Sequence, residues 1–145
     1  MRYSSLVLLF VIAILANCSN NKGQDEAGAS AEQGDIGLEA DVNRIHDEVM
    51  PRMGELYKLK KKLQQRDTAA STTPAEKTKI NAAIQKLDSA YDGMMNWMHQ
   101  YKPEEHQEEE EEAREYLEGE LEKIKKVKSD MLGAIETGKT IVGEQ

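Results

Sequence analysis

The sequence predicts an all-α protein: a three-helix up-down-up antiparallel bundle with coiled-coil-like lines of apolar residues, preceded by a signal peptide and a disordered spacer. Its 145 residues are enough for one domain of ordinary size. Charged residues make up 32% of the chain and aromatic residues only 5%, which is typical of helices with narrow apolar faces and not of a thick sheet core. Beyond position 36, apolar residues recur with the period of a helix in three segments.

The N-terminal segment, residues 1–17, resembles a bacterial lipoprotein export signal. Its unbroken apolar run at positions 6–16 suits the core of a secretory signal but is too short for a membrane-spanning helix, which needs roughly 20 residues. The run ends in Leu-Ala and leads through Asn17 to Cys18, and lipoprotein signals likewise carry leucine three positions before their cysteine. Asn17 departs from the pattern, which has Gly, Ala or Ser at that place. The alternative is ordinary secretion, with cleavage after Ala16 and a free thiol left over.

This resemblance implies that Cys18 is lipidated: diacylglycerol alkylates its thiol, and a fatty acid such as palmitate acylates its new amine. Because each buried CH₂ contributes about 0.8 kcal/mol, several acyl chains together make the attachment effectively permanent. Ser19 follows the cysteine, which by analogy with lipoprotein sorting rules indicates the outer membrane of the bacterial cell envelope. The predicted partner is therefore the membrane, bound through the acyl chains on Cys18.

The formal net charge of -8 limits the other partners. Nucleic-acid binding requires clustered Lys and Arg that displace counterions from phosphates, so no nucleic-acid partner is expected. An acidic chain is also not expected to be held at an anionic lipid surface by charge alone.

Residues 18–35 are predicted to comprise the lipidated cysteine and a flexible spacer, because from position 19 to 34 no apolar residue is larger than Ala. Residues 36–143 are predicted to form the bundle, with helices at about 37–67, 74–102 and 104–142. Short connections favour hairpins within one chain, and the alternative is long coiled coils that pair between chains.

Three proline signals divide the helical region. Pro51 predicts a kink in the first helix because it lacks an amide donor. Thr73, Pro74 and Glu76 form a capping-box pattern that predicts the start of the second helix, and Pro103 predicts its end. The predicted apolar lines are Leu38, Val42, Ile45, Val49, Leu56, Leu59 and Leu63 in the first helix, Ile80, Ile84, Leu87, Tyr91, Met94, Met98 and Tyr101 in the second, and Leu117, Leu121, Ile124, Met131, Ile135 and Val142 in the third.

The glutamate-rich segment at 104–115 leaves open whether the apolar residues at the end of the second helix are covered. Simple antiparallel pairing sets it against Met94 and Met98, although its only apolar residue is Ala113. The segment is either a loop that slides the third helix along the second, or a helix that leaves an apolar patch open, and we favour the helix that begins near Pro103. The candidate interaction patch is then Met94, Met95, Trp97, Met98 and Tyr101, since Met is adaptable and Trp is a common interface anchor. The alternative is that these residues are core.

Neither a metal site nor an active site is indicated strongly. His46, His99 and His106 fall toward the methionine-rich end, where imidazole and thioether sulfur suit copper and imidazole with carboxylate suits zinc. However, the sequence has no HxxxH, HExxH or CxxC spacing, and no GxSxG or Gly-rich phosphate loop. We expect no cofactor and no enzymatic activity.

The segment DGMMNWMHQYKP at 92–103 is similar to a stretch in small helical lipoproteins of the Bacteroidetes type, often labelled viral A-type inclusion protein-like because of their coiled-coil character. The resemblance implies the layout of export signal, spacer and three helices, but no particular activity. The expected function is that of a non-enzymatic envelope lipoprotein, structural or engaged with an envelope protein partner. The alternative is a periplasmic lipoprotein that binds a metal or small ligand with its Met- and His-bearing end.

Overall fold

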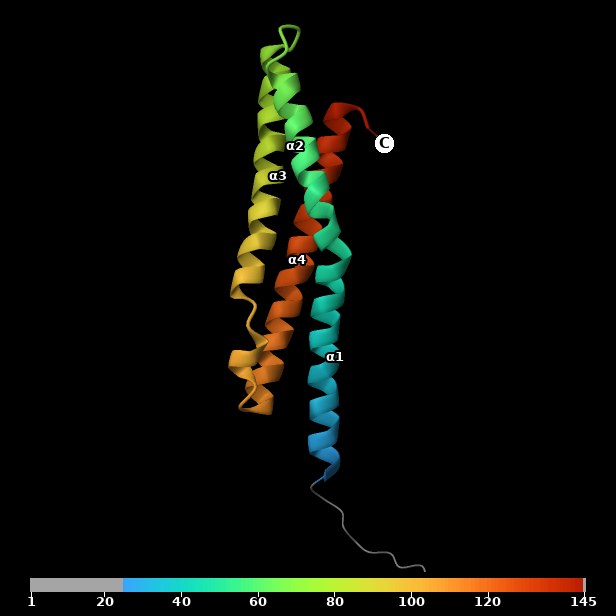
Figure 1. Ribbon diagram of the computed structural model, residues 1–145, viewed down its shortest axis with the longest axis vertical. Coiled ribbons are helices and arrows are strands. Elements are labelled where there is room, and N and C mark those ends of the chain that lie inside the picture. The colour runs from blue at the N-terminus through green and yellow to red at the C-terminus, as the bar shows by residue number, and fades with distance from the viewer. Residues whose placement is uncertain (1–24, 145) are drawn as a thin grey trace, which may run out of the picture.

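The computed structural model of the protein describes the backbone of residues 25–144 and the side chains of residues 37–144. This part of the chain contains no β-strand. Its elements are α1 (Asp25–Val49), the short 3-10 helix η1 (Met50–Arg52), α2 (Met53–Asp67), α3 (Pro74–Gln100), the 3-10 helix η2 (Pro103–His106) and α4 (Glu110–Val142). α1, η1 and α2 follow one another as one bent rod, so that three rods pack together (Figure 1). The predicted all-α, up-down-up antiparallel bundle is confirmed.

The two ends of the bundle carry different connections. The turn between α2 and α3 lies at the end toward which α4 runs, whereas the α3–α4 connection lies at the opposite end, which α1 approaches from its N-terminal side (Figure 1). The N-terminal end of α1 therefore lies at the end of the bundle that carries the α3–α4 connection.

The start of α1 differs from the predicted spacer at 18–35. The backbone is helical from Asp25 onward, so the prediction is wrong for residues 25–35. Ala, Glu and Gln dominate this stretch and have high helix propensity, and extending an existing helix costs less than nucleating one. The export signal, the lipidated Cys18 and residues 19–24 lie outside the described residues. Among the helices that are described, none is long and apolar enough to cross a bilayer.

The structure has a break in the first rod at Pro51 and the start of α3 at Pro74, as the sequence predicts. Pro51 lies in η1, where the chain tightens to i→i+3 bonding and the backbone N–H of Met53 donates to the carbonyl of Met50. At the start of α3, the Glu76 N–H donates to Thr73 Oγ1 over 3.3 Å, and the Thr73 N–H donates to Glu76 Oε2 over 2.9 Å. This reciprocal pair is a complete capping box.

The third helix begins later than predicted. After Lys102, the chain forms η2 and then runs outside helix until α4 begins at Glu110, so the predicted start near position 104 is wrong. Two effects account for the delay. Closely spaced glutamates repel one another at i,i+3 and i,i+4, and a start at Glu110 places Glu110, Glu111 and Glu112 in the first turn, where the helix dipole favours acidic side chains.

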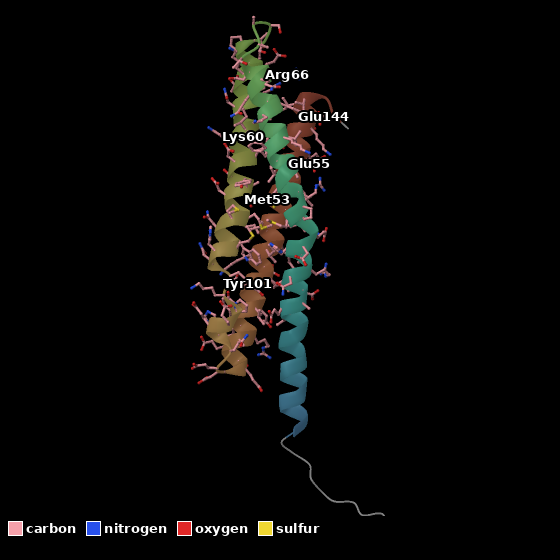
Figure 2. The ribbon with its side chains drawn as sticks, in the orientation of Figure 1. Met53, Glu55, Lys60, Arg66, Tyr101 and Glu144 are labelled. Atoms are coloured by element: carbon pink, nitrogen blue, oxygen red, sulfur yellow. The ribbon has the colours of Figure 1, made fainter. Side chains whose placement is uncertain are left out.

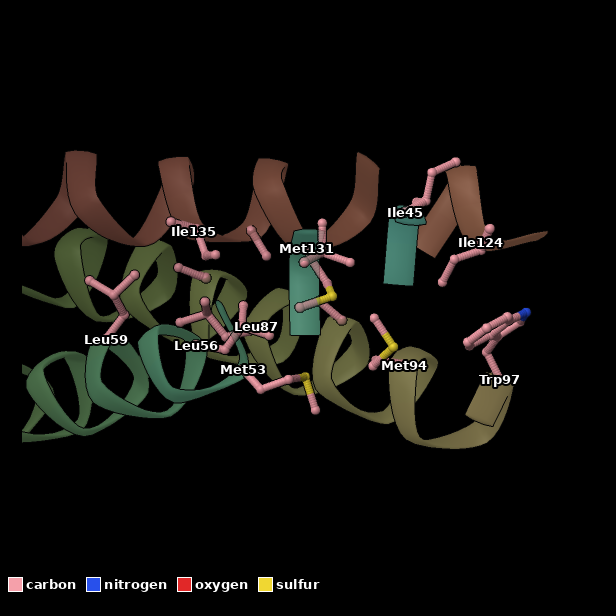
Figure 3. Packing of buried hydrophobic residues seen from close by; sticks show 14 of the residues in the cluster. Ile45, Met53, Leu56, Leu59, Leu87, Met94, Trp97, Ile124, Met131 and Ile135 are labelled. Carbon is pink, nitrogen blue, oxygen red and sulfur yellow. The ribbon is translucent and has the colours of Figure 1, made fainter. Parts of the chain in front are cut away.

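The core is one continuous apolar cluster along the bundle axis (Figure 3). In α3 its buried members differ from the predicted line: Ala83 and Ala90 are buried, whereas Tyr91 is exposed. The buried apolar residues are Val42, Ile45, Val49, Met53, Leu56, Leu59, Leu63, Ile80, Ala83, Leu87, Ala90, Met94, Trp97, Leu117, Ile124, Met131, Ala134 and Ile135.

Among the glycines with described surroundings, Gly138 of α4 is the one that packs closely against the other rods. A Cβ atom at this position would lie 3.3 Å from Leu59 Cδ1 and 3.5 Å from Leu87 Cδ1. Ion pairs also connect the rods, among them Lys60–Asp88, Lys128–Glu48 and Lys139–Glu55.

Candidate functional site

The predicted interaction patch is part of the core and not an open surface. Met94 is 0% exposed and Trp97 is 6% exposed, while Met95, Met98 and Tyr101 are partly buried and pack against the core cluster. The prediction of an open patch is therefore wrong. The connection at 101–109, which contains η2, corresponds to the alternative in which a loop shifts the third helix along the second. As a result, the first turns of α4 cover the end of α3.

A buried carboxylate joins α4 to α3 at this end. Glu120 is only 2% exposed, and its Oε2 accepts a hydrogen bond of 2.8 Å from the Trp97 indole Nε1. Its other oxygen, Oε1, accepts a bond of 2.7 Å from Lys123 Nζ, whose side chain is largely exposed. A buried carboxylate without such partners would be costly, so the arrangement is a satisfied structural contact. Glu120 does not stand out in the sequence, because several other glutamates surround it. Its spacing of three residues from Leu117, which is on the predicted apolar line, was the available signal.

Around this contact, aromatic rings from three rods and η2 form a row, which we call the aromatic row: His46, Trp97, Tyr101, Tyr116 and His106. Ring centroids lie 5.7 Å apart for His46 and Trp97, and 4.9 Å apart for Trp97 and Tyr101. The next distances are 6.3 Å from Tyr101 to Tyr116 and 4.1 Å from Tyr116 to His106. The first pair is tilted and the other three are stacked, and aromatic contacts of these kinds add stability beyond the buried area. The row thus fixes α1, α3, η2 and α4 to one another.

The two tyrosines of the row differ in their hydroxyl groups. The Tyr116 hydroxyl oxygen accepts a hydrogen bond of 2.6 Å from the Lys102 backbone N–H. The Tyr101 hydroxyl is buried and has no partner among the side chains that the structure describes. Burial, followed by the charge of Glu39, raises the pKa of Tyr101 to about 12.

The three histidines do not come together as metal ligands. His46 Nδ1 lies 2.9 Å from Asp47 Oδ1, and His106 Nδ1 lies 3.0 Å from Glu112 Oε1 at the other end of the row. His99 is exposed on α3. Among the residues with described side chains, no group of three or more His, Cys, Asp and Glu is placed to hold a metal ion. The geometry therefore gives no support to a metal site built from these histidines.

Two exposed tyrosines lie away from the aromatic row, on the face formed by α2 and α3. Tyr57 is 54% exposed and Tyr91 is 40% exposed. Both line a cleft of about 330 Å³, which we call the Tyr57–Tyr91 cleft, together with Leu56, Lys60, Leu87, Asp88 and Asp92. The sequence prediction missed this cleft because it placed Tyr91 on the apolar line of its helix. The available signal was Tyr57, which stands next to Leu56 but off the apolar line of its own helix.

A second, larger groove of about 820 Å³ lies between α3 and α4. Its walls are mainly short side chains, including Ala82, Ser89, Ser129 and Thr137 together with Gly133. No aromatic side chain lines it, so it lacks the large contact surfaces that usually anchor a ligand.

The fold and these surfaces define a three-helix bundle protein with an aromatic, carboxylate-bearing core at one end and an aromatic cleft on the α2–α3 face. Comparison of the chain with protein-family models, with curated proteins and with solved structures finds no match in any of the three. The similarity of the segment at 92–103 to small helical lipoproteins stays a prediction.

Proposed function

We propose that the protein is a non-enzymatic lipoprotein of the bacterial cell envelope, anchored in the outer membrane through acyl chains on Cys18, whose bundle serves as an interaction module. The observation that carries this proposal is the cysteine that directly follows the apolar run at 6–16 and Asn17. An apolar run of this length followed by a lone cysteine fits a lipoprotein signal better than a secreted chain with an unused thiol.

The shape of the bundle supports this role. Asp25, the first residue of α1, follows Cys18 closely in the chain. An anchor at Cys18 would therefore place the acidic α3–α4 connection nearest the membrane and the α2–α3 turn farthest from it (Figure 1). Carboxylates at the near end would be repelled by anionic lipid, which favours a bundle that stands away from the bilayer.

The side chains that could act as an acid or a base at this end of the bundle already have partners within the protein, which supports a role without catalysis. Both oxygens of Glu120 accept structural hydrogen bonds, from Trp97 and Lys123. The imidazoles of His46 and His106 lie against Asp47 and Glu112 within the aromatic row. Glu120, which is almost wholly buried and has both oxygens held by structural partners, is poorly placed to transfer a proton to a substrate.

The anchor is tested by metabolic labelling of the full chain with a radioactive or alkyne-bearing palmitate in a bacterial host. The wild-type chain is expected to take up label and to sediment with the outer-membrane fraction. Cys18→Ser should abolish labelling and release the protein from that fraction, or leave it as uncleaved precursor. Asn17→Gly is the matched control, and it should retain both labelling and sedimentation. A wild-type chain that is secreted without label would refute the proposal.

A further inference from the structure

The Tyr57–Tyr91 cleft combines an apolar floor with aromatic walls. Leu56 and Leu87 line it and are each only 1% exposed, so they form its floor. Tyr57 and Tyr91 come from α2 and α3 and remain open to solvent. At about 330 Å³ the cleft lies at the small end of the range of ligand sites, roughly 300–1,000 Å³. Its size therefore suits one ring of a ligand and not an extended molecule.

The polar groups of the cleft carry both signs of charge. Lys60 lies where α2 and α3 run alongside each other (Figure 2), and its Nζ lies 2.6 Å from Asp88 Oδ1. Asp92 stands one helical turn after Asp88 and also lines the cleft. Lys61 Nζ lies 5.1 Å from the centroid of the Tyr57 ring, so a cation already occupies one side of that ring.

This distribution of charge discriminates between classes of ligand. Lys60 is paired with Asp88 in the cleft. Asp92 in the cleft and Lys61 beside the Tyr57 ring carry opposite charges, so no net charge attracts a cationic or an anionic ligand, and each would meet groups of its own sign. An uncharged ligand with many hydroxyl groups meets neither penalty, because a hydroxyl both donates to a carboxylate and accepts from an ammonium group. The exposed tyrosine rings require, in addition, that this ligand have an apolar face.

We propose that the Tyr57–Tyr91 cleft binds one pyranose ring of an uncharged glycan. The C–H face of the sugar packs on the tyrosine rings, and its hydroxyls donate to Asp88 and Asp92 and accept from Lys60. The proposal deepens the proposed function by naming what the interaction module binds. Its test is separate, since glycan binding is measured without reference to Cys18 and the two proposals can fail independently.

The test is a titration of the purified full chain with uncharged tetrasaccharides, in a detergent that has no sugar headgroup. Cellotetraose, maltotetraose and the tetramer of N-acetylglucosamine serve as probes, and calorimetry or saturation-transfer NMR reports binding. At least one probe is expected to bind saturably. Tyr57→Ala and Tyr91→Ala should each weaken that binding about tenfold, the loss expected for one stacking contact of about 1.4 kcal/mol.

Two controls separate binding from folding. Met50→Ala removes a side chain of similar exposure, 37%, that does not line the cleft, and it should leave the affinity unchanged. Tyr57→Phe keeps the ring and should retain most of the affinity. Because both tyrosines are exposed, thermal unfolding of the alanine variants should match that of the wild type. Absence of binding to all three probes, or binding that both tyrosine-to-alanine variants retain, would overturn the proposal.

Discussion

The indole Nε1 of Trp97 donates a hydrogen bond of 2.8 Å to Oε2 of Glu120, a carboxylate that is almost wholly buried between α3 and α4. Since a helix can slide along its neighbour only in steps that preserve side-chain packing, a polar pair at one position specifies which step is adopted. Here the pair sets the first turns of α4 over the end of α3. The Met and Trp residues that the sequence left as either an open patch or core are thereby part of the core.

We expect Glu120→Gln to lower the free energy of unfolding by about 1–2 kcal/mol, because an amide cannot accept from both Trp97 and Lys123 and buries an unpaired donor. The matched control is Glu118→Gln, an exposed position of the same helix, for which the change should stay within about 0.5 kcal/mol. Urea unfolding followed by the fluorescence of the single tryptophan measures both. Equal midpoints for the two variants would show that the buried contact contributes nothing.

Glycines in α4 offer a second comparison. Gly133→Ala should stabilise the protein by about 0.5–1 kcal/mol, since alanine favours the helix and a Cβ there meets nothing within 4 Å. Gly138→Ala gains the same propensity, but its Cβ would lie 3.4 Å from Leu59 Cβ, an atom attached directly to the backbone of α2. We therefore expect Gly138→Ala to be less stable than Gly133→Ala by at least about 1 kcal/mol. Thermal unfolding of both variants decides the matter, and equal gains would contradict the close packing.

Acid should weaken the contact between α4 and the first rod through Glu55 (Figure 2). Hydrogen bonds from Lys139 and then from Arg52 hold the pKa of Glu55 below its ordinary value of 4.5. A lowered pKa means that its contribution is fully present above pH 4.5 and is lost as the pH falls through the lower folded-state value. Glu55→Gln should cost about 1 kcal/mol at pH 7 and nothing in strong acid.

The control for this pH dependence is Glu136→Gln, an exposed position of α4, which should follow the wild type at every pH. Urea midpoints collected between pH 7 and pH 2 measure both variants. If the difference between Glu55→Gln and the wild type stayed constant over that range, the ion pairs of Glu55 would not be its cause.

The sequence predicts the three rods because their large apolar residues repeat with helical spacing, and the start of α3 because Thr73 and Glu76 form a local motif. It does not predict which face of α3 is buried, since Ala83 and Ala90 carry too little apolar surface to mark a line. In the structure those alanines are buried and Tyr91 is exposed, because the three rods pack around a face of α3 that the apolar residues alone do not specify.

The candidate sites were harder to predict than the rods, for a related reason. Met94 lies on the predicted apolar line and Trp97 lies off it, yet both residues were compatible with a core and with an open patch, and the choice depended on where α4 begins. That start reflects a balance between helix propensity and repulsion among adjacent glutamates, two small effects of opposite sign. The Tyr57–Tyr91 cleft depends in turn on how α2 and α3 are rotated about their axes, which no local motif specifies.

The last prediction concerns the two tyrosines of the aromatic row. Because the Tyr101 hydroxyl is buried and lacks a partner among the described side chains, Tyr101→Phe should leave the stability unchanged or raise it by up to about 1 kcal/mol. Tyr116→Phe removes the bond to the Lys102 N–H and should lower stability by about 1 kcal/mol. The two variants make the same chemical change one ring apart, so each serves as the control of the other in urea unfolding.

Alkaline titration gives the same pair a second readout. The pKa of Tyr101 is raised from 10.0 to about 12, so the folded state holds this proton more tightly than the unfolded state. The free energy of unfolding should therefore decrease as the pH rises from about 10 toward 12, and Tyr101→Phe should lose that part of the decrease. Absorbance of tyrosinate at alkaline pH should likewise lose its latest-titrating component in Tyr101→Phe. A variant that kept this component would show that another tyrosine titrates last, contrary to the raised pKa of Tyr101.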